Sequence, residues 1–324
     1  MLKDNYYSVL FTGGLDSSYR LCQLAQDERA IIQPIYILFP NDGHIHKRPE
    51  LQRELEAQDK ILAYIQAQPQ TKAKFLSIKR IHRDAIPKDQ RIMDLEGELS
   101  EYKFGWQYLY IALLTRWQSG LELCHETLPP ELLNNKVKFK KVNNRICTDC
   151  DKSDFLFTEL FKDVTWPILN VSRKQMIEDI KNWGYSDIYN LIWFCYDSVD
   201  GKPCGFCDNC NVKISEGLTF LFTKEAIHRY LVFSFIFYCL PNYTRDLYRK
   251  YVKNQIRDGM RDNELRWIKR FSKIELLNND RLKKMIIEGT VEYNDSKTQC
   301  LNRILKFRND TERRDRLLRI FKNI

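Results

Sequence analysis

The sequence predicts an α/β fold with a parallel sheet, followed by an all-helical extension. Runs of apolar and β-branched residues alternate with helical stretches through residues 1–217, which is the pattern of parallel sheets that carry helices on both faces. Beyond residue 217 the alternation fades, and helical periods rich in Lys and Arg replace it. We therefore expect two domains, at residues 1–217 and 218–324, without a Pro- or Gly-rich linker between them.

Four strands and three helices are expected first, and a fourth helix later. The strands are short apolar runs at residues 7–11, 31–39, 74–81 and 121–124. The helices between them are expected at residues 16–26, 49–66 and 104–118. The later helix starts at Ser172, because Ser172 and Gln175 have the spacing of a capping box, and Gly184 ends it.

Composition and charge narrow the class of protein. The 324 residues are 44% apolar and 29% charged, which excludes disordered, collagen-like and coiled-coil chains. The net charge of +9 is uneven: residues 221–324 carry 24 Lys and Arg against 13 Asp and Glu, and the remainder carries 28 against 30. This basic C-terminal extension predicts a protein partner or nucleic acid, and the alternative is a solvated helix face.

No membrane segment or secretion signal is expected. The first seven residues carry no apolar signal core, so we expect a cytoplasmic protein. The longest apolar run, residues 230–240, is too short for a bilayer, which needs about 20 residues, and predicts a buried helix.

A pair of glycines, Gly13 and Gly14, directly follows the first expected strand. Glycines let backbone N–H groups approach an anion, and the N-terminus of the following helix favours negative charge. The hydroxyl groups and the carboxylate near this pair would add contacts to a bound phosphate, with the alternative of a tight turn without ligand. They belong to Thr12, Asp16, Ser17 and Ser18. The segment has neither the Walker nor the dinucleotide spacing of glycines.

Four cysteines with metal-ligand spacing follow at Cys195, Cys204, Cys207 and Cys210. Two successive Cys-x₂-Cys steps suit a closed, structural Zn²⁺ site within residues 195–210. An iron–sulfur cluster also takes four cysteines, and four unligated thiols are the remaining alternative.

These segments resemble a known enzyme family. The loop Thr12–Ser18 is similar to the Ser-Gly-Gly-x-Asp-Ser loop of the ATP pyrophosphatase superfamily, the PP-loop proteins. Further motifs resemble, in order, those of the 7-cyano-7-deazaguanine synthase family of that superfamily: Arg53–Ala57, Thr148–Asp151, Pro167–Ile180, Trp193–Tyr196 and Pro203–Cys210. The resemblance covers residues 5–217.

The resemblance implies a Rossmann-like domain of the adenine nucleotide alpha hydrolase type, with ATP, Mg²⁺ and Zn²⁺ as cofactors. The family activates 7-carboxy-7-deazaguanine as an acyl-adenylate, releases pyrophosphate and lets ammonia displace AMP. Asp149 would read the deazaguanine ring, because a carboxylate accepts from its N–H donors; the alternative is an exposed loop acid. The residues implied to hold pyrophosphate and Mg²⁺ are Thr12, Gly13, Gly14, Asp16, Ser17 and Ser18, with Asp16 and Ser17 catalytic.

The sequence departs from the family at positions that face the substrate. Asp151 stands where the family has Arg, and Lys213 replaces another Arg. The Pro-x-Arg-Asn segment is not recognisable, and residues 102–105 stand near its place. Cys124-His125-Glu126 replaces a glycine at the fourth strand's exit. This pattern resembles the divergent synthase-like proteins of bacterial anti-phage defence cassettes, with the same activation chemistry and an altered acceptor.

Two other functions stay open. A tRNA-modifying thiolase or ligase of the same superfamily would use Cys147 or Cys150 for sulfur transfer. A catalytically degenerate scaffold would bind nucleotide or a partner without turnover. His44, His46 and His125 are weaker candidates for the site.

Overall fold

The computed structural model describes residues 5–39, 50–96, 107–125, 160–161 and 163–230, and the backbone alone of residues 139–142 and 145–148. The chain divides into two compact units, Met1–Trp193 and Phe194–Ile324, and each is described by itself. The functional boundary expected at residue 217 stays a prediction.

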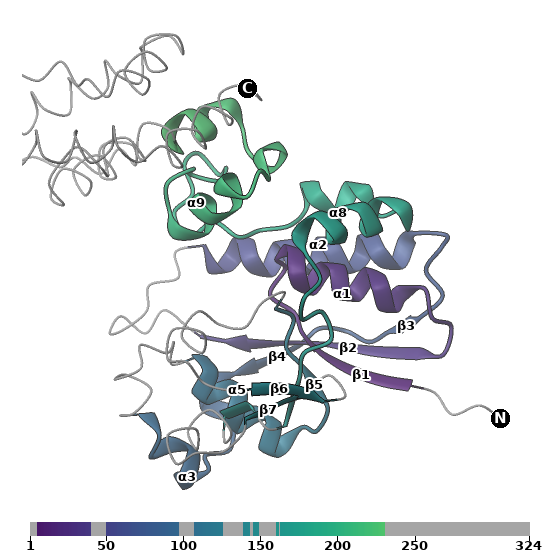
Figure 1. Cartoon of the computed structure of the whole chain (residues 1–324), viewed down its shortest axis with the longest axis vertical. Coiled ribbons are helices and arrows are strands. Elements are labelled where there is room, and N and C mark those ends of the chain that lie inside the picture. The colour runs from purple at the N-terminus through teal and green to yellow at the C-terminus, as the bar shows by residue number, and fades with distance from the viewer. Residues whose placement is uncertain are drawn as a thin grey trace, which may run out of the picture. The chain divides into compact units, whose positions relative to one another are not determined.

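The first unit is built on one sheet in the order β3-β2-β1-β5-β8-β7-β6, with β4 also paired to β2 (Figure 1). Six described strands are parallel, whereas β6 and β7 are antiparallel to their neighbours. The strands are β1 (Asn5–Leu10), β2 (Ala30–Leu38), β3 (Lys74–Phe75), β4 (Lys79–His82), β5 (Leu121–Glu122), β6 (Phe139–Val142), β7 (Arg145–Thr148) and β8 (Val164–Thr165). The predicted α/β class with a parallel sheet is confirmed.

Helices lie on both faces of this sheet (Figure 1). One face carries α1 (Leu15–Ala25), α2 (Leu51–Ala67) and α8 (Arg173–Asn182). The other carries α5 (Gln107–Trp117) and the short α3 (Gln90–Met93). The buried side chains of α5 pack with those of β1, β2 and β5 in one apolar cluster, because parallel strands must be covered on both sides.

The expected strand at residues 74–81 is wrong as a single element, since the structure has two strands there, β3 and β4. Both pair with β2, but the pairing is interrupted opposite Gln33 and Pro34. Pro34 has no N–H and cannot donate to a neighbouring strand. The Gln33 side chain instead donates to the Ser77 carbonyl at 2.6 Å, which holds the interrupted segment in place.

Helix α8 begins as predicted but forms only half of the expected capping box. The Ser172 side chain accepts from the Gln175 N–H at 3.2 Å. The Gln175 side chain, however, donates to Asp179 at 2.7 Å instead of reaching back to the helix start. The helix stops before Gly184 as predicted: Gly184 follows the C-cap Trp183 with φ at +82°, and the N–H groups of Gly184 and Tyr185 donate to the carbonyls of Lys181 and Ile180 in a Schellman motif.

The second unit is described only to residue 230. It contains α9 (Asp208–Ser215), the 3₁₀ turn η4 (Thr219–Leu221) and helical residues 224–230. Residues 231–324, which carry most of the basic excess, lie outside the described residues.

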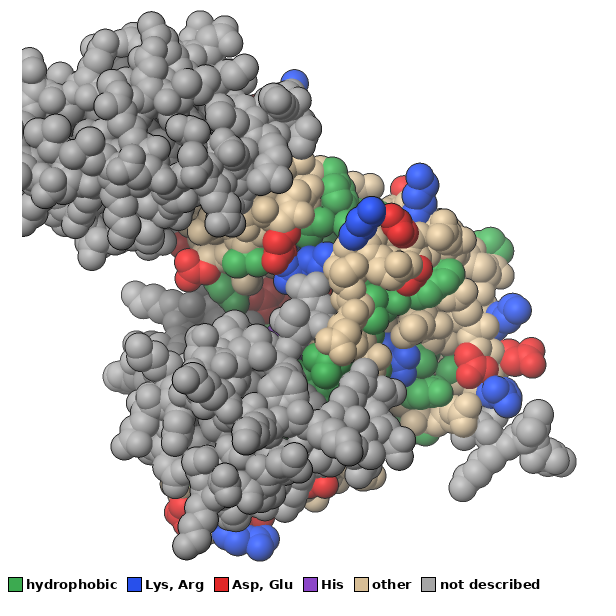
Figure 2. Space-filling view, viewed as in Figure 1, with side chains coloured by type: hydrophobic (Ala, Val, Ile, Leu, Met, Phe, Trp, Pro, Cys, Tyr) green, Lys and Arg blue, Asp and Glu red, His purple; other side chains and the backbone are tan. Residues whose placement is uncertain are grey.

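On the described surface in Figure 2, acidic and basic side chains are interspersed. In the described part of the chain, no helix has the length and apolar character needed to cross a membrane.

Candidate functional site

The topology of the sheet places the glycine pair at a switch point. From β1 the chain passes through α1 to β2, whereas β5 lies on the other side of β1. Connections that leave a strand in opposite directions open a crevice at the strands' carboxyl ends, where α/β proteins bind ligands. Gly13 and Gly14 follow β1 at this edge, and Leu123, Cys124 and His125 follow β5.

Gly13 is a glycine for two structural reasons. Its φ of +77° lies in the left-handed region, which strains other residues. A Cβ at Gly13 would also lie 3.3 Å from Cγ of Gln58, a fully buried residue of α2. Gly14 has an ordinary φ of −85°, so the tight conformation of the loop is concentrated at Gly13.

The hydroxyl groups of the loop face one another at long distances. Thr12 Oγ1 and Ser17 Oγ are 3.5 Å apart, and the Gly14 N–H donates to Thr12 Oγ1 at 3.4 Å. Hydrogen bonds of this length are weak. Thr12 is exposed and Ser17 is 4% exposed. The two hydroxyls therefore lie close together but bind each other only weakly.

The start of α1 offers hydrogen-bonding groups without partners. Its N-cap, Gly14, has no side chain to accept from the first N–H groups, which also lack intrahelical acceptors. Asp16 Oδ1 and Ser18 Oγ are buried and have no hydrogen-bond partner. Buried polar groups are normally paired, so unpaired ones at a helix start indicate a place for a ligand or ion.

Cys124, at the exit of β5, is not poised as a nucleophile. Burial raises its pKa well above the ordinary value, and the negative charges of Glu122 and Asp16 raise it further against the opposing effect of Arg20. The thiol is therefore protonated at neutral pH and weakly nucleophilic. The neighbouring His125 ring lies 6.1 Å from the ring of Trp166, between centroids.

The structure places the six residues predicted for the phosphate loop together: Thr12, Gly13 and Gly14 lie between β1 and α1, and Asp16, Ser17 and Ser18 lie in the first turn of α1. Cys147 belongs to strand β7. The remaining candidates of the sequence analysis lie outside the described residues: His44, His46, Glu126, Asp149, Cys150 and Asp151.

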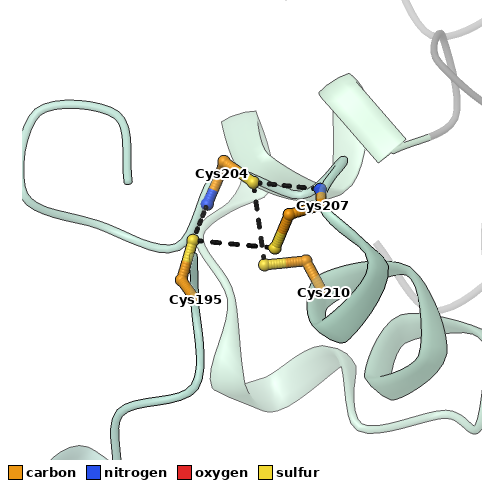
Figure 3. A group of neighbouring side chains, drawn as sticks. All are labelled: Cys195, Cys204, Cys207 and Cys210. Atoms are coloured by element: carbon orange, nitrogen blue, oxygen red, sulfur yellow. Dashed lines mark hydrogen bonds between the residues drawn. The ribbon is translucent and has the colours of Figure 1, made fainter. Parts of the chain in front are cut away.

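The second unit contains the predicted cysteine cluster, in which the four Sγ atoms lie within 4.8 Å of one another and are buried (Figure 3). Cys195 and Cys207 are 4.0 Å apart, and Cys204 and Cys210 are 3.8 Å apart, between sulfurs. A tetrahedral Zn²⁺ with bonds of about 2.3 Å places its sulfur ligands roughly 3.8 Å apart. The four thiols could therefore hold a metal ion.

Backbone N–H groups point at two of these sulfurs. Cys195 Sγ accepts from Asp197 and Cys204 at 3.4 and 3.2 Å, and Cys204 Sγ accepts from Phe206 and Cys207 at 3.3 and 3.2 Å. Such donors stabilise thiolate charge. Hydrogen bonds with the neighbouring cysteines, Cys195 first, lower the pKa of Cys207, whereas the hydrogen bonds of Cys210 with Cys195, Cys204 and Cys207 raise the pKa of Cys210.

The folding of the chain around the cluster is tight. Gly205 has φ at +86°, and a Cβ there would clash with the Ala226 carbonyl. The Arg229 side chain donates to the Cys204 carbonyl at 2.7 Å, and the Asn209 side chain donates to the Phe194 carbonyl at 2.9 Å. Helical residues 224–230 thus pack against the turn that contains Cys204 and Gly205.

Sequence reasoning missed the contacts that support the loop and the helix after it. Gln58 packs under Gly13, the backbone N–H of Trp193 donates to the Gly13 carbonyl at 3.1 Å, and Arg20 of α1 pairs with Glu122. Gln58 and Trp193 reach the loop from distant segments of the chain, and no local pattern in the sequence signals either contact.

Comparison with known proteins does not assign the chain to a family. No protein-family model matches it, and no curated protein matches it.

Proposed function

We propose that the chain is an ATP-dependent adenylating enzyme that splits ATP into AMP and pyrophosphate at the glycine loop. The observation that carries this proposal is the placement of an uncapped helix start, with unpaired Asp16 and Ser18 side chains, at the switch point of a parallel sheet. A polyphosphate matches these groups, because it is an anion that accepts from N–H and O–H donors.

Each loop residue has a chemical task in this proposal. The N–H groups at the start of α1 and the hydroxyls of Thr12, Ser17 and Ser18 donate to the leaving pyrophosphate. Asp16 holds Mg²⁺, a hard cation that prefers carboxylate oxygen. These contacts stabilise the negative charge that leaves with pyrophosphate, which is the main means of catalysis in phosphate chemistry.

The proposed substrate is a 7-deazaguanine carboxylate, and this rests on the resemblance to 7-cyano-7-deazaguanine synthases. The substrate carboxylate attacks the α-phosphorus of ATP, and pyrophosphate leaves. An amine, either ammonia or one on a partner, then attacks the acyl carbon, and AMP leaves with formation of a C–N bond. Asp149 is the residue proposed to read the deazaguanine ring, and the altered segments support an altered acceptor, as in anti-phage defence.

The cysteine cluster is proposed to bind Zn²⁺ in a structural role. Its donors are four buried sulfurs, and the set has no oxygen or nitrogen ligand among the described residues. Four sulfur ligands fill a tetrahedral site and leave no position for substrate. Elemental analysis of the purified chain should find about one zinc per chain; iron with visible absorbance would instead assign an iron–sulfur cluster.

A turnover assay tests the proposed reaction. The full chain is mixed with ATP, Mg²⁺ and 7-carboxy-7-deazaguanine, with and without ammonium, and the products are identified by mass spectrometry. AMP and pyrophosphate that form only with the carboxylate support the proposal, and a nitrile product identifies a complete synthase. Binding of ATP without AMP formation under every condition would contradict it and favour the scaffold.

Two variants connect the assay to the loop. Ser17→Ala and Asp16→Asn should each lower the rate of AMP formation about a hundredfold, because each removes a contact to the reacting phosphates or Mg²⁺. Ser215→Ala is the matched control, since Ser215 is half-buried and lies on α9 outside the loop. An equal loss of AMP formation in Ser215→Ala would contradict the assignment of Asp16 and Ser17 to the reacting phosphates and Mg²⁺.

A further inference from the structure

The indole of Trp166 is buried with an unsatisfied N–H group. Trp166 is fully buried, and no described residue offers a hydrogen-bond acceptor to its Nε1. Its ring packs in the apolar cluster that includes α5, with its centroid 5.5 Å from that of Phe161 and 6.1 Å from that of His125. An indole N–H is a donor only, and burial of a donor without an acceptor costs free energy. The N–H of Trp166 is therefore suited to an acceptor from outside the described part of the chain.

Trp166 lies at the carboxyl edge of the sheet, which is also the edge of the glycine loop. Strand β8 ends at Thr165, whose carbonyl accepts from the Leu123 N–H at 2.9 Å, and Trp166 is the next residue. Along this edge the strands follow in the order β1, β5, β8. Trp166 is thus two strand spacings, roughly 10 Å, from the end of β1. A bicyclic ring with a carboxyl group can bridge this distance.

The exit of β5 lies between the glycine loop and Trp166. Burial raises the pKa of the Cys124 thiol most, and the charges of Glu122 and Asp16 raise it further, which places Cys124 near the loop. The next residue, His125, has its ring beside that of Trp166. A substrate that extends from the loop to Trp166 would therefore pass over Cys124 and His125.

We propose that Trp166 is a specificity-determining residue, whose N–H donates to an acceptor atom in the heterocyclic ring of the substrate. The acceptor is a ring nitrogen or a carbonyl oxygen, since an amino group at that point would meet a donor with a donor. The loop then binds the polyphosphate, and the edge formed by β5 and β8 binds the ring. This inference rests on the proposed function and deepens it, because it names a residue that selects the substrate.

The test measures two dissociation constants of the full chain by calorimetric titration in excess Mg²⁺. The first is for an ATP analogue in which a methylene group replaces the oxygen between the α and β phosphates. The second is for 7-carboxy-7-deazaguanine, titrated into chain saturated with that analogue. Trp166→Phe keeps an aromatic ring and removes the N–H donor. It should bind the carboxylate about tenfold more weakly, the equivalent of one hydrogen bond, and the ATP analogue as wild type does.

Trp117→Phe is the matched control. Trp117 is 54% exposed and ends α5, just before β5 begins at the opposite edge of the sheet. The same substitution there should leave both dissociation constants at their wild-type values. A tenfold loss of carboxylate affinity in Trp117→Phe would contradict an effect specific to the edge that carries Trp166.

A second ligand isolates the hydrogen bond from the packing of the indole. Indole-3-carboxylate has a bicyclic ring of similar size and an equivalent carboxyl group, but its ring carries neither a nitrogen acceptor nor a carbonyl oxygen. Wild type should bind it more weakly than 7-carboxy-7-deazaguanine, and Trp166→Phe should bind it as wild type does. The loss in Trp166→Phe should therefore appear with only one of the two ligands, as a coupled pair requires.

Urea unfolding of the free chain separates a binding role from a structural one. Trp166→Phe removes no hydrogen bond of the free chain, so its unfolding midpoint should stay close to that of wild type. A lower midpoint with unchanged carboxylate affinity would overturn the inference, and so would equal losses of affinity for the two carboxylates. Wild type that binds the ATP analogue but not 7-carboxy-7-deazaguanine would instead refute the proposed substrate. Wild type that does not bind the analogue would refute the proposed function of the loop, and the inference falls with either.

Discussion

The side chains of Arg20 and Glu122 form a two-pronged ion pair, with 2.8 Å from Nε to Oε2 and 2.7 Å from Nη2 to Oε1. Arg20 lies on α1 and Glu122 ends β5, so the pair ties together the two elements that flank the switch point. The side chains are only 13% and 10% exposed. Burial alone would lower the pKa of Arg20, but the hydrogen bond and charge of Glu122 outweigh it and raise the pKa.

Removal of one partner of this pair should destabilise the first unit. Arg20→Met leaves the Glu122 carboxylate buried without its main partner, which should lower the free energy of unfolding by about 3 kcal/mol. Urea unfolding followed by circular dichroism measures the change. The double variant Arg20→Met with Glu122→Leu should recover most of the loss, because no charge is then left unpaired. Additive losses in the double variant would contradict a coupled pair.

Alanine substitutions at two glycines with left-handed backbone distinguish the cost of backbone strain from an effect on the glycine loop. Gly13 and Gly120 have φ of +77° and +71°, but a Cβ would crowd Gln58 only at Gly13 and meets nothing within 4 Å at Gly120. Alanine at either position should cost about 1 kcal/mol of stability. Only Gly13→Ala should also lose ATP binding, by at least tenfold in calorimetric titration. Equal affinities in the two variants would show that the conformation of Gly13 is unrelated to a ligand.

The same comparison applies to the cysteine cluster. Gly205 and Gly217 have φ of +86° and +88°, but a Cβ at Gly205 would clash with the backbone of Ala226, whereas Gly217 has open space. Gly205→Ala should displace the segment that presents Cys204 and lower the zinc content of the purified protein well below one per chain. Gly217→Ala should keep its zinc. Elemental analysis of both variants measures the zinc content. A full zinc content in Gly205→Ala would contradict the prediction.

The parts of the fold that could be predicted from the sequence are those that depend on patterns of a few neighbouring residues. The glycine pair, the cysteine spacing and the helix limits at Ser172 and Gly184 are encoded within a few residues, and the structure places them as expected. The interruption between β3 and β4 was missed because its cause, Pro34, lies on a different strand. No local pattern in residues 74–81 signals a proline that will lie opposite.

The contacts that support the candidate site were unpredictable for the same reason. Trp193 donates to Gly13 across 180 residues of sequence, and the position of Arg20 opposite Glu122 depends on the strand order. The Gln175 side chain had two partners within reach, the helix start and Asp179, and its spacing could not decide between them. Tertiary packing determines the partner in each case, and the partner is visible only in the assembled fold.

The half-buried phenol of Tyr189 predicts how stability falls at high pH. Tyr189 lies in the 3₁₀ turn η3 (Ser186–Asn190) and donates to the Ile177 carbonyl at 2.8 Å. Burial raises its pKa from 10.0 to about 12, with a smaller contribution from Cys22. The folded state thus holds the phenol proton more tightly than the unfolded state does. This contribution to stability is fully present below pH 10 and is lost as pH rises toward about 12.

Tyr189→Phe isolates this contribution. The variant should be less stable than wild type by about 1 kcal/mol below pH 10, because it lacks the hydrogen bond to Ile177. Its free energy of unfolding should fall less steeply between pH 10 and about 12, so that the two curves converge. Tyr6→Phe, at a position that is 58% exposed, should follow the wild-type curve throughout. Parallel curves for wild type and Tyr189→Phe would mean that the phenol ionises equally in both states, and that η3 opens to solvent before the unit unfolds.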